Sequence, residues 1–101
     1  MALGTFFPIF VAELLGTFFF LTTILTTGSA IPIGVALAAA ITFGGFISSA
    51  HFNPAVSVMM LAKGDISLGE FPIYLVAQIA GGLLALAWFH LKPIPTSSTK
   101  V

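Results

Sequence analysis

The fold of this chain depends on one polar stretch in an otherwise apolar sequence, Ser48-Ser49-Ala50-His51-Phe52-Asn53-Pro54-Ala55. Asn53 is a preferred residue for a helix N-cap and Pro54 suits the first helical position, so a new helix is predicted to begin here. The apolar piece that follows gives a helix of about nine residues and roughly 13 Å, about half of a bilayer's hydrocarbon thickness. The polar turn Lys63-Gly64-Asp65 then returns the chain to water. Because non-helical backbone at membrane depth is tolerated only inside protein or along a wet cavity, residues 48–62 are predicted to form a re-entrant loop and half-helix.

Three longer apolar blocks surround this loop, at about residues 6–27, 31–47 and 68–90. Each has about the 20 apolar residues that a transmembrane helix needs. Glu70 and Pro72 interrupt only the start of the third block, where a first helical turn tolerates both. We therefore expect an all-α membrane protein with three transmembrane helices and one re-entrant half-helix. It would form a single domain over residues 1–101, with a polar, mobile tail at 93–101.

Small residues recur at helical spacing within two of these blocks. The second block carries two such rows, and the third carries one; in order they are Gly34, Ala38 and Thr42, then Ala36, Ala40 and Gly44, then Ala77, Gly81 and Ala85. Such rows let helix backbones approach closely where lipid supplies no hydrophobic drive. We expect both helices to pack tightly against neighbours.

The composition agrees with a membrane protein and excludes several classes of function. Hydrophobic residues make up 58% of the chain and charged residues only 6%, whereas roughly a quarter of residues are charged in soluble domains. Three basic and three acidic residues give a formal net charge of zero, which excludes a basic nucleic-acid binder. The chain has no cysteine, and its two histidines, His51 and His90, have no acidic residue at helical spacing. We expect no enzyme activity, no metal site and no cofactor.

The start of the half-helix has the chemistry of a site for neutral solutes. It places free backbone N–H groups and the positive end of a helix dipole inside the membrane, which repels cations. The Asn53 side chain offers N–H donors, and the irregular backbone of Ser49, Ala50, His51 and Phe52 offers carbonyl acceptors. Donors on one wall and acceptors on another describe a pore for small uncharged molecules. The alternative interpretation is that Asn53 only caps a buried half-helix.

Three motifs of this chain resemble those of the aquaporin and aquaglyceroporin channels, the major intrinsic protein family. The loop stretch resembles the family's first Asn-Pro-Ala loop, with Ala-His before it and Val-Ser after it. The first block contains a stretch similar to the signature of the family's first helix, Ala12-Glu13-Leu14-Leu15-Gly16-Thr17-Phe18. The last block contains a stretch similar to the third helix, Tyr74-Leu75-Val76-Ala77-Gln78-Ile79-Ala80-Gly81. The three motifs occur in the family's order and lie on the elements assigned above.

The resemblance implies roles for individual residues that line the pore. Asn53 would donate a hydrogen bond to the passing solute, and Pro54 and Ala55 would form the central contact between two half-helices. His51 would be a hydrogen-bonding residue that stabilises the loop, and not a proton carrier. Ile33 would correspond to one member of the family's aromatic/arginine filter, where an aliphatic residue implies a wider or more apolar constriction.

The resemblance also implies that two polar residues of the neighbouring helices brace the loop. Glu13 would accept hydrogen bonds from its backbone N–H groups, since a charge in lipid is expensive unless it has partners. Gln78 would be a similar polar packing residue. The alternative for Glu13 is a lipid-facing side chain that reaches the interface, which its depth in the helix disfavours.

The family fold has six spanning helices in two inverted repeats, and this sequence matches the first repeat only. It contains one Asn-Pro-Ala and no arginine. A lone half-helix would leave its donors facing lipid, so we expect either a second copy in inverted orientation or a separate chain with the other repeat. The charge bias that sets membrane orientation is slight, with Lys63 on one side and Lys92 and Lys100 on the other.

The predicted function is therefore a passive channel, or half of one, for water or small neutral solutes such as glycerol. Its partners would be the lipid bilayer and a second copy or a complementary half-channel subunit, with no nucleic acid. The alternative is a small structural subunit of a larger membrane complex, with no transport activity.

Overall fold

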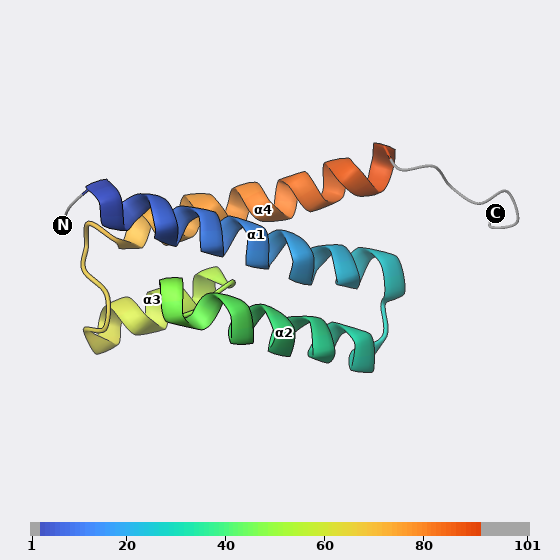
Figure 1. Ribbon diagram of the computed structural model, residues 1–101, viewed down its shortest axis with the longest axis horizontal. Coiled ribbons are helices and arrows are strands. Elements are labelled where there is room, and N and C mark those ends of the chain that lie inside the picture. The colour runs from blue at the N-terminus through green and yellow to red at the C-terminus, as the bar shows by residue number, and fades with distance from the viewer. Residues whose placement is uncertain (1–2, 92–101) are drawn as a thin grey trace, which may run out of the picture.

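In the computed structural model, residues 3–91 are described and form four helices (Figure 1). They are α1 at Leu3–Thr27, α2 at Ala30–Ser48, α3 at Pro54–Lys63 and α4 at Phe71–Leu91. Helices α1, α2 and α4 are long and apolar enough to cross a membrane, whereas α3 is shorter. The predicted fold class, all-α with three long helices and a half-helix, is confirmed. The predicted mobile tail at 93–101 lies outside the described residues, and the single domain over 1–101 stays a prediction.

Helix α1 lies at the centre of the arrangement. It packs against both α2 and α4, whereas α3 packs against α4. Figure 1 shows α1 and α4 side by side and running in the same direction, with α2 running the opposite way. The reversal between α1 and α2 takes place at Gly28, whose φ of 60° is the left-handed conformation that glycine adopts without strain.

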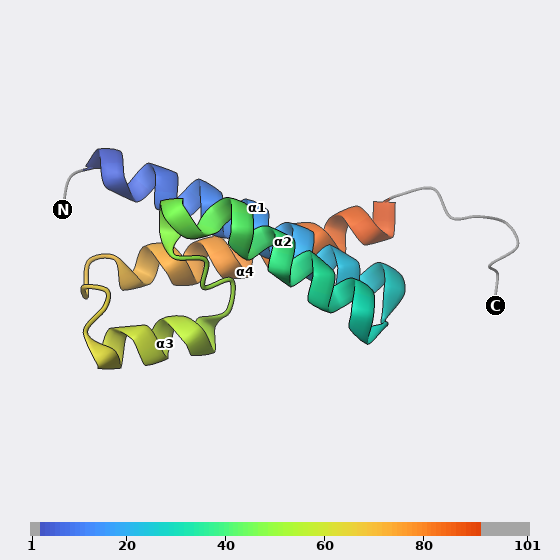
Figure 2. The ribbon, with the colours of Figure 1, turned by 60° about the horizontal axis from the view of Figure 1, so that its bottom comes forward.

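Helix α3 reaches only about halfway along the bundle. It has ten residues, or about 15 Å at the standard rise. Figures 1 and 2 show it beginning near the middle of the bundle and running back to the end where α1 and α4 begin. Gly64 ends it with a φ of 93° and donates its N–H to the carbonyls of Leu61 and Met60. The chain therefore enters and leaves on the same side, which is the geometry of a re-entrant segment.

Small residues form the contact between α1 and α4. Ala77, Gly81 and Ala85 are buried on one face of α4. A Cβ atom at Gly81 would lie 2.7 Å from the carbonyl oxygen of Leu14 in α1, so only glycine permits this approach. The two helices pack backbone to backbone, as expected where lipid supplies no hydrophobic drive.

In α2, only one of the two predicted rows of small residues is buried. Ala36, Ala40 and Gly44 face the interior, and the other row, Gly34, Ala38 and Thr42, is exposed. Both rows have the same spacing, so spacing alone cannot choose between them. The choice follows from which face of α2 meets α1.

The start of α4 differs from the prediction. The helix begins at Phe71 rather than at 68, so Glu70 precedes it instead of lying in its first turn. Residues 67–70 form a turn with a reciprocal pair of hydrogen bonds: Ser67 N–H donates to Glu70 Oε1 at 2.8 Å, and Glu70 N–H donates to Ser67 Oγ at 3.1 Å. This is the bonding pattern of a capping box, which begins a helix. Pro72, however, has no N–H to donate to the Leu68 carbonyl, so the regular helix begins only at Phe71. The start of α1, at Leu3, precedes the predicted one by three residues, and the remaining helix ends lie within one residue of the predicted ones.

Candidate functional site

The loop between α2 and α3 has an unusual backbone. Ser49, Ala50 and Phe52 have φ angles of 73°, 53° and 55°, in the left-handed region that L-residues other than glycine enter at a cost of about 1–2 kcal/mol each. Ser49 is also the C-cap of α2 and donates its N–H to the Gly45 carbonyl. Three such residues in a stretch of four persist only where the surroundings hold them. The hydrogen bonds around the loop stabilise this backbone conformation.

Glu13 is the centre of these hydrogen bonds. Its side chain is fully buried and comes from α1. Oε2 accepts from His51 N–H at 2.9 Å and from Ser48 Oγ at 2.7 Å. Oε1 accepts from Phe52 N–H at 2.8 Å and from Gln78 Nε2 at 2.9 Å. Four donors from α2, the loop and α4 therefore converge on one carboxylate, which offsets the desolvation of its charge.

A second group of polar side chains ties the loop to α3 and α4. Ser57 Oγ, on α3, accepts from Gln78 Nε2 at 2.9 Å and lies 2.8 Å from His51 Nδ1. The His51 ring stacks on Tyr74 with 4.2 Å between centroids. Tyr74 also donates its hydroxyl to the Ser48 carbonyl. His51 is buried in this group, and its Nδ1 atom is directed at Ser57.

Phe52 anchors the loop between α1 and α2. Its ring is 2% exposed. A Cβ atom at Gly16 would lie 2.2 Å from the Phe52 ring, and one at Gly44 would lie 3.0 Å from it. The two glycines leave the space that the ring fills. Phe52 thus fixes the depth to which the loop enters the bundle.

Asn53 occupies the N-cap of α3. Its Oδ1 accepts from Ala55 N–H at 2.8 Å, which satisfies one of the free N–H groups at the helix start. Since the oxygen is used in this way, the Nδ2 amide group is the part of the side chain that can donate to a solute. Asn53, Pro54 and Ala55 are all exposed in the described structure.

A groove of about 400 Å³ lies beside Asn53. Phe52 and Pro54 border it at the loop, and α1 and α4 form its walls, with Thr17 and Gln78 as polar residues among apolar ones. This groove combines the Asn53 amide with mostly apolar walls.

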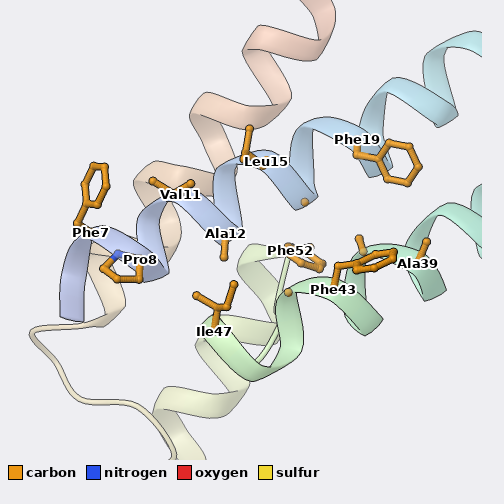
Figure 3. A pocket seen from close by; sticks show the side chains of 13 residues that line it. Phe7, Pro8, Val11, Ala12, Leu15, Phe19, Ala39, Phe43, Ile47 and Phe52 are labelled. Atoms are coloured by element: carbon orange, nitrogen blue, oxygen red, sulfur yellow. The ribbon is translucent and has the colours of Figure 1, made fainter. Parts of the chain in front are cut away.

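A second groove, of about 660 Å³, lies on the other side of Phe52, between α1 and α2 (Figure 3). Figure 3 shows Phe19 and Phe43 on its walls and Phe52 between the two helices. None of the residues that line it has a polar side chain. This groove therefore offers no side-chain hydrogen bond.

The structure brings together most of the residues singled out from the sequence. Asn53, Pro54 and Ala55 follow Ser49, Ala50 and His51 in one loop, and Glu13 and Gln78 contact that loop or its partners. Ile33 is separate, because it lies in the first turn of α2, at the opposite end of that helix from Ser48.

For four residues of the site, the sequence analysis predicted no role of the side chain. Ser48, Phe52, Ser57 and Tyr74 complete the hydrogen bonds and the packing of the loop. One signal was available for Ser57, a hydroxyl on an otherwise apolar half-helix. Nothing local marks Phe52, since an aromatic residue in an apolar chain carries no positional information.

Three helices of spanning length and a capped half-helix that turns back at mid-depth define an integral, multi-pass membrane protein with a re-entrant loop. Comparison with known sequences identifies its family. The chain belongs to the major intrinsic protein family, whose model matches residues 2–99. Members of this family are passive membrane channels and not enzymes.

Several curated proteins are similar to the chain. A glycerol uptake facilitator protein-like 6 of Lactiplantibacillus plantarum is 40% identical over 88 residues, which cover 77% of this chain and 40% of the relative. A glycerol uptake facilitator protein of Streptococcus pneumoniae is 39% identical over 62 residues, which cover 59% of this chain and 26% of the relative. Nodulin-26 of Glycine max is 37% identical over 92 residues, which cover 89% of this chain and 34% of the relative. The matches thus span 26 to 40% of the length of these relatives. The search of solved structures gave no significant match.

Proposed function

We propose that this chain forms one half of a passive channel for water or small neutral solutes such as glycerol. The observation that carries the proposal is the exposed Asn53, held at the start of a half-helix by a loop whose backbone is bonded to the buried Glu13. The family match and the similar glycerol uptake facilitators support it. The solute would pass along the groove beside Asn53.

The electrostatics of this site favour neutral solutes over cations. The N-terminus of α3 carries the positive end of a helix dipole, equivalent to about half an elementary charge. Asn53 Nδ2 would donate to a water or alcohol oxygen, and the carbonyls of the loop at Ser49 and Ala50 would accept from its hydroxyl. A small hydroxyl-bearing molecule exchanges its hydrogen bonds with water for these, whereas an ion loses more hydration than the site replaces.

In this proposal the chain provides one wall of the pore and a second half provides the other. Pro54 and Ala55 are exposed beside Asn53, and we propose that they meet a second half-helix at the centre of the membrane. That half-helix would come from a second copy in inverted orientation or from a complementary half-channel. Ile33, at the far end of α2, would line the narrowest part of the path and make it apolar.

The test is osmotic shrinkage of proteoliposomes that contain the protein, with and without the change Asn53→Asp. The aspartate keeps an oxygen to cap Ala55 N–H but loses the N–H donor and adds a negative charge. We expect shrinkage well above that of empty vesicles, reduced about tenfold by Asn53→Asp, which corresponds to about 1.4 kcal/mol on the barrier. Thr26→Ala, at the exposed far end of α1, serves as the control and should leave the rate unchanged.

Two results would contradict the proposal in different ways. Shrinkage no faster than that of empty vesicles, with no effect of Asn53→Asp, would exclude a channel made of this chain alone. Stoichiometric co-purification with unrelated membrane proteins, with permeability still absent, would favour a structural subunit instead.

A further inference from the structure

Phe52 lies between two grooves of different chemistry. The groove between α1 and α2 has no polar side chain in its lining, whereas the lining of the groove beside Asn53 includes Thr17 and Gln78. Among the residues that the structure describes, Phe52 is the only one that lines both grooves. Figure 3 shows it between the two helices of the apolar groove. The side chain of Phe52 therefore belongs to the wall that separates the grooves.

The ring of Phe52 fills a gap that two glycines leave between α1 and α2. Its Cε1 and Cζ atoms lie 2.2 and 2.4 Å from the position that a Cβ atom at Gly16 would take, and Cζ lies 3.0 Å from the corresponding position at Gly44. One edge of the ring thus faces both helices. Only 2% of the residue is exposed, so little free space surrounds it. At this depth the loop makes the wall between the grooves, since neither glycine has a side chain to fill the gap.

The same loop carries the Phe52 ring and the Asn53 amide. Phe52 N–H donates to Glu13 Oε1 at 2.8 Å, and Asn53 follows it in the chain as the N-cap of α3. The ring that fills the gap is therefore fixed to the loop, and it enters the gap only when the loop is in place. A side chain from either helix would close the gap without depending on the loop.

We propose that Phe52 seals the groove beside Asn53 against hydrocarbon from the groove between α1 and α2. This proposal rests on the proposed function, in which the solute passes beside Asn53. Phe43, on the wall of the apolar groove, is 74% exposed, so that groove is open to the lipid around the helices. An alkyl chain that reached the Asn53 amide would displace the solute and accept no hydrogen bond, which leaves the donor unpaired. Phe52 thus has two roles, as the anchor of the loop and as a part of the pore wall.

Two variants separate these roles. Phe52→Ala removes the ring and opens a gap between two glycines, and an apolar cavity of this kind stays dry and takes up benzene. Phe52→Ala combined with Gly16→Leu fills the gap from α1, because a Cβ atom at Gly16 points into the space of the ring. The combined variant restores the wall but not the anchor. Phe52→Leu opens a smaller gap and replaces Phe52→Ala should that variant fail to fold or conduct.

The first readout is the osmotic shrinkage of proteoliposomes with and without benzene, corrected for empty vesicles. We expect benzene to leave the rate of the wild-type protein unchanged, to remove most of the rate of Phe52→Ala, and to leave the rate of the combined variant unchanged. Phe52→Leu should show a smaller loss. Equal benzene responses of Phe52→Ala and the combined variant would show that Phe52 only anchors the loop, and would overturn the proposal.

The second readout needs no transport: it is the thermal unfolding midpoint of each protein in detergent, with and without benzene. A ligand that binds only the folded state raises this midpoint. Relative to the wild-type protein, we expect benzene to raise the midpoint of Phe52→Ala and not that of the combined variant. No rise for Phe52→Ala would overturn the proposal. A wild-type protein that gives no shrinkage contradicts the channel proposal instead, so the two failures can be told apart.

Discussion

At the scale of single residues, the site depends on the buried carboxylate of Glu13. Glu13 accepts four hydrogen bonds from Ser48, His51, Phe52 and Gln78. Two of them come from the loop backbone, whose left-handed residues could not persist without them. A carboxylate suits this place because it offers only acceptors, and every neighbour that points at it is a donor.

We predict that Glu13→Gln destabilises the protein by about 2–4 kcal/mol, since it removes the charge and turns an NH₂ group toward donors of the loop. The free energy of unfolding in detergent measures this loss. The rate of osmotic shrinkage of proteoliposomes should fall together with that free energy. Glu70→Gln is the matched control. Its Oε1 accepts only from Ser67 N–H at the start of α4, and glutamine keeps that acceptor, so the change should stay below about 1 kcal/mol. Equal losses for both variants would contradict the role given to Glu13.

At the scale of the elements, the half-helix stays in place because two long helices pack closely behind it. Helix α4 carries Tyr74 and Gln78 to the loop, and the distance between α4 and α1 determines whether Gln78 reaches Glu13. Gly81 sets that distance, one turn beyond Gln78. A substitution at Gly81 should therefore disturb the loop, although Gly81 itself does not contact it.

Gly81→Ala should destabilise the protein more than Gly82→Ala, its neighbour. The added Cβ at Gly81 meets the backbone oxygen of Leu14 at 2.7 Å, which cannot move alone, whereas at Gly82 it meets only the end of the Leu21 side chain at 3.1 Å. We expect a loss of about 1–3 kcal/mol for Gly81→Ala, as for overpacked cores, and a small change for Gly82→Ala. Thermal unfolding of both variants under the same conditions measures the difference, and equal midpoints would show that α1 and α4 can separate freely.

At the scale of the whole molecule, the proposed channel requires a second half-helix opposite α3. Asn53, Pro54 and Ala55 are exposed, and we propose that they lie near the middle of the membrane. The exposed polar amide of Asn53 would be unfavourable in lipid at that depth. The proposed inverted second copy would bring two such half-helix starts together around a pseudo-two-fold axis.

The lack of cysteine in the chain makes this arrangement testable with a single substitution. We predict that Ala55→Cys forms an oxidant-dependent disulfide between two copies in a membrane, seen as a dimer on a non-reducing gel. Thr26→Cys, exposed at the far end of α1, should remain monomeric under the same conditions. A monomeric Ala55→Cys protein would contradict the inverted homodimer and leave the complementary half-channel as the proposed partner.

The sequence by itself determined the elements of this protein. Long apolar blocks predict spanning helices because lipid requires every backbone group to be bonded within the segment. The pair Asn53 and Pro54 predicts the start of the half-helix, since a cap and a first-turn proline act locally. The motif resemblance placed Glu13 at the loop backbone, and the structure has it there; the functional roles of the site residues stay predictions.

Only the tertiary structure decided how these elements meet. Glu13 and Gln78 are 65 positions apart and bond to one another, and Phe52 fits between Gly16 and Gly44 on two different helices. The choice of the buried row of α2 also depends on such contacts. The physical reason is that lipid contributes little to the choice between helix faces of similar polarity, so close packing and distant hydrogen bonds make that choice.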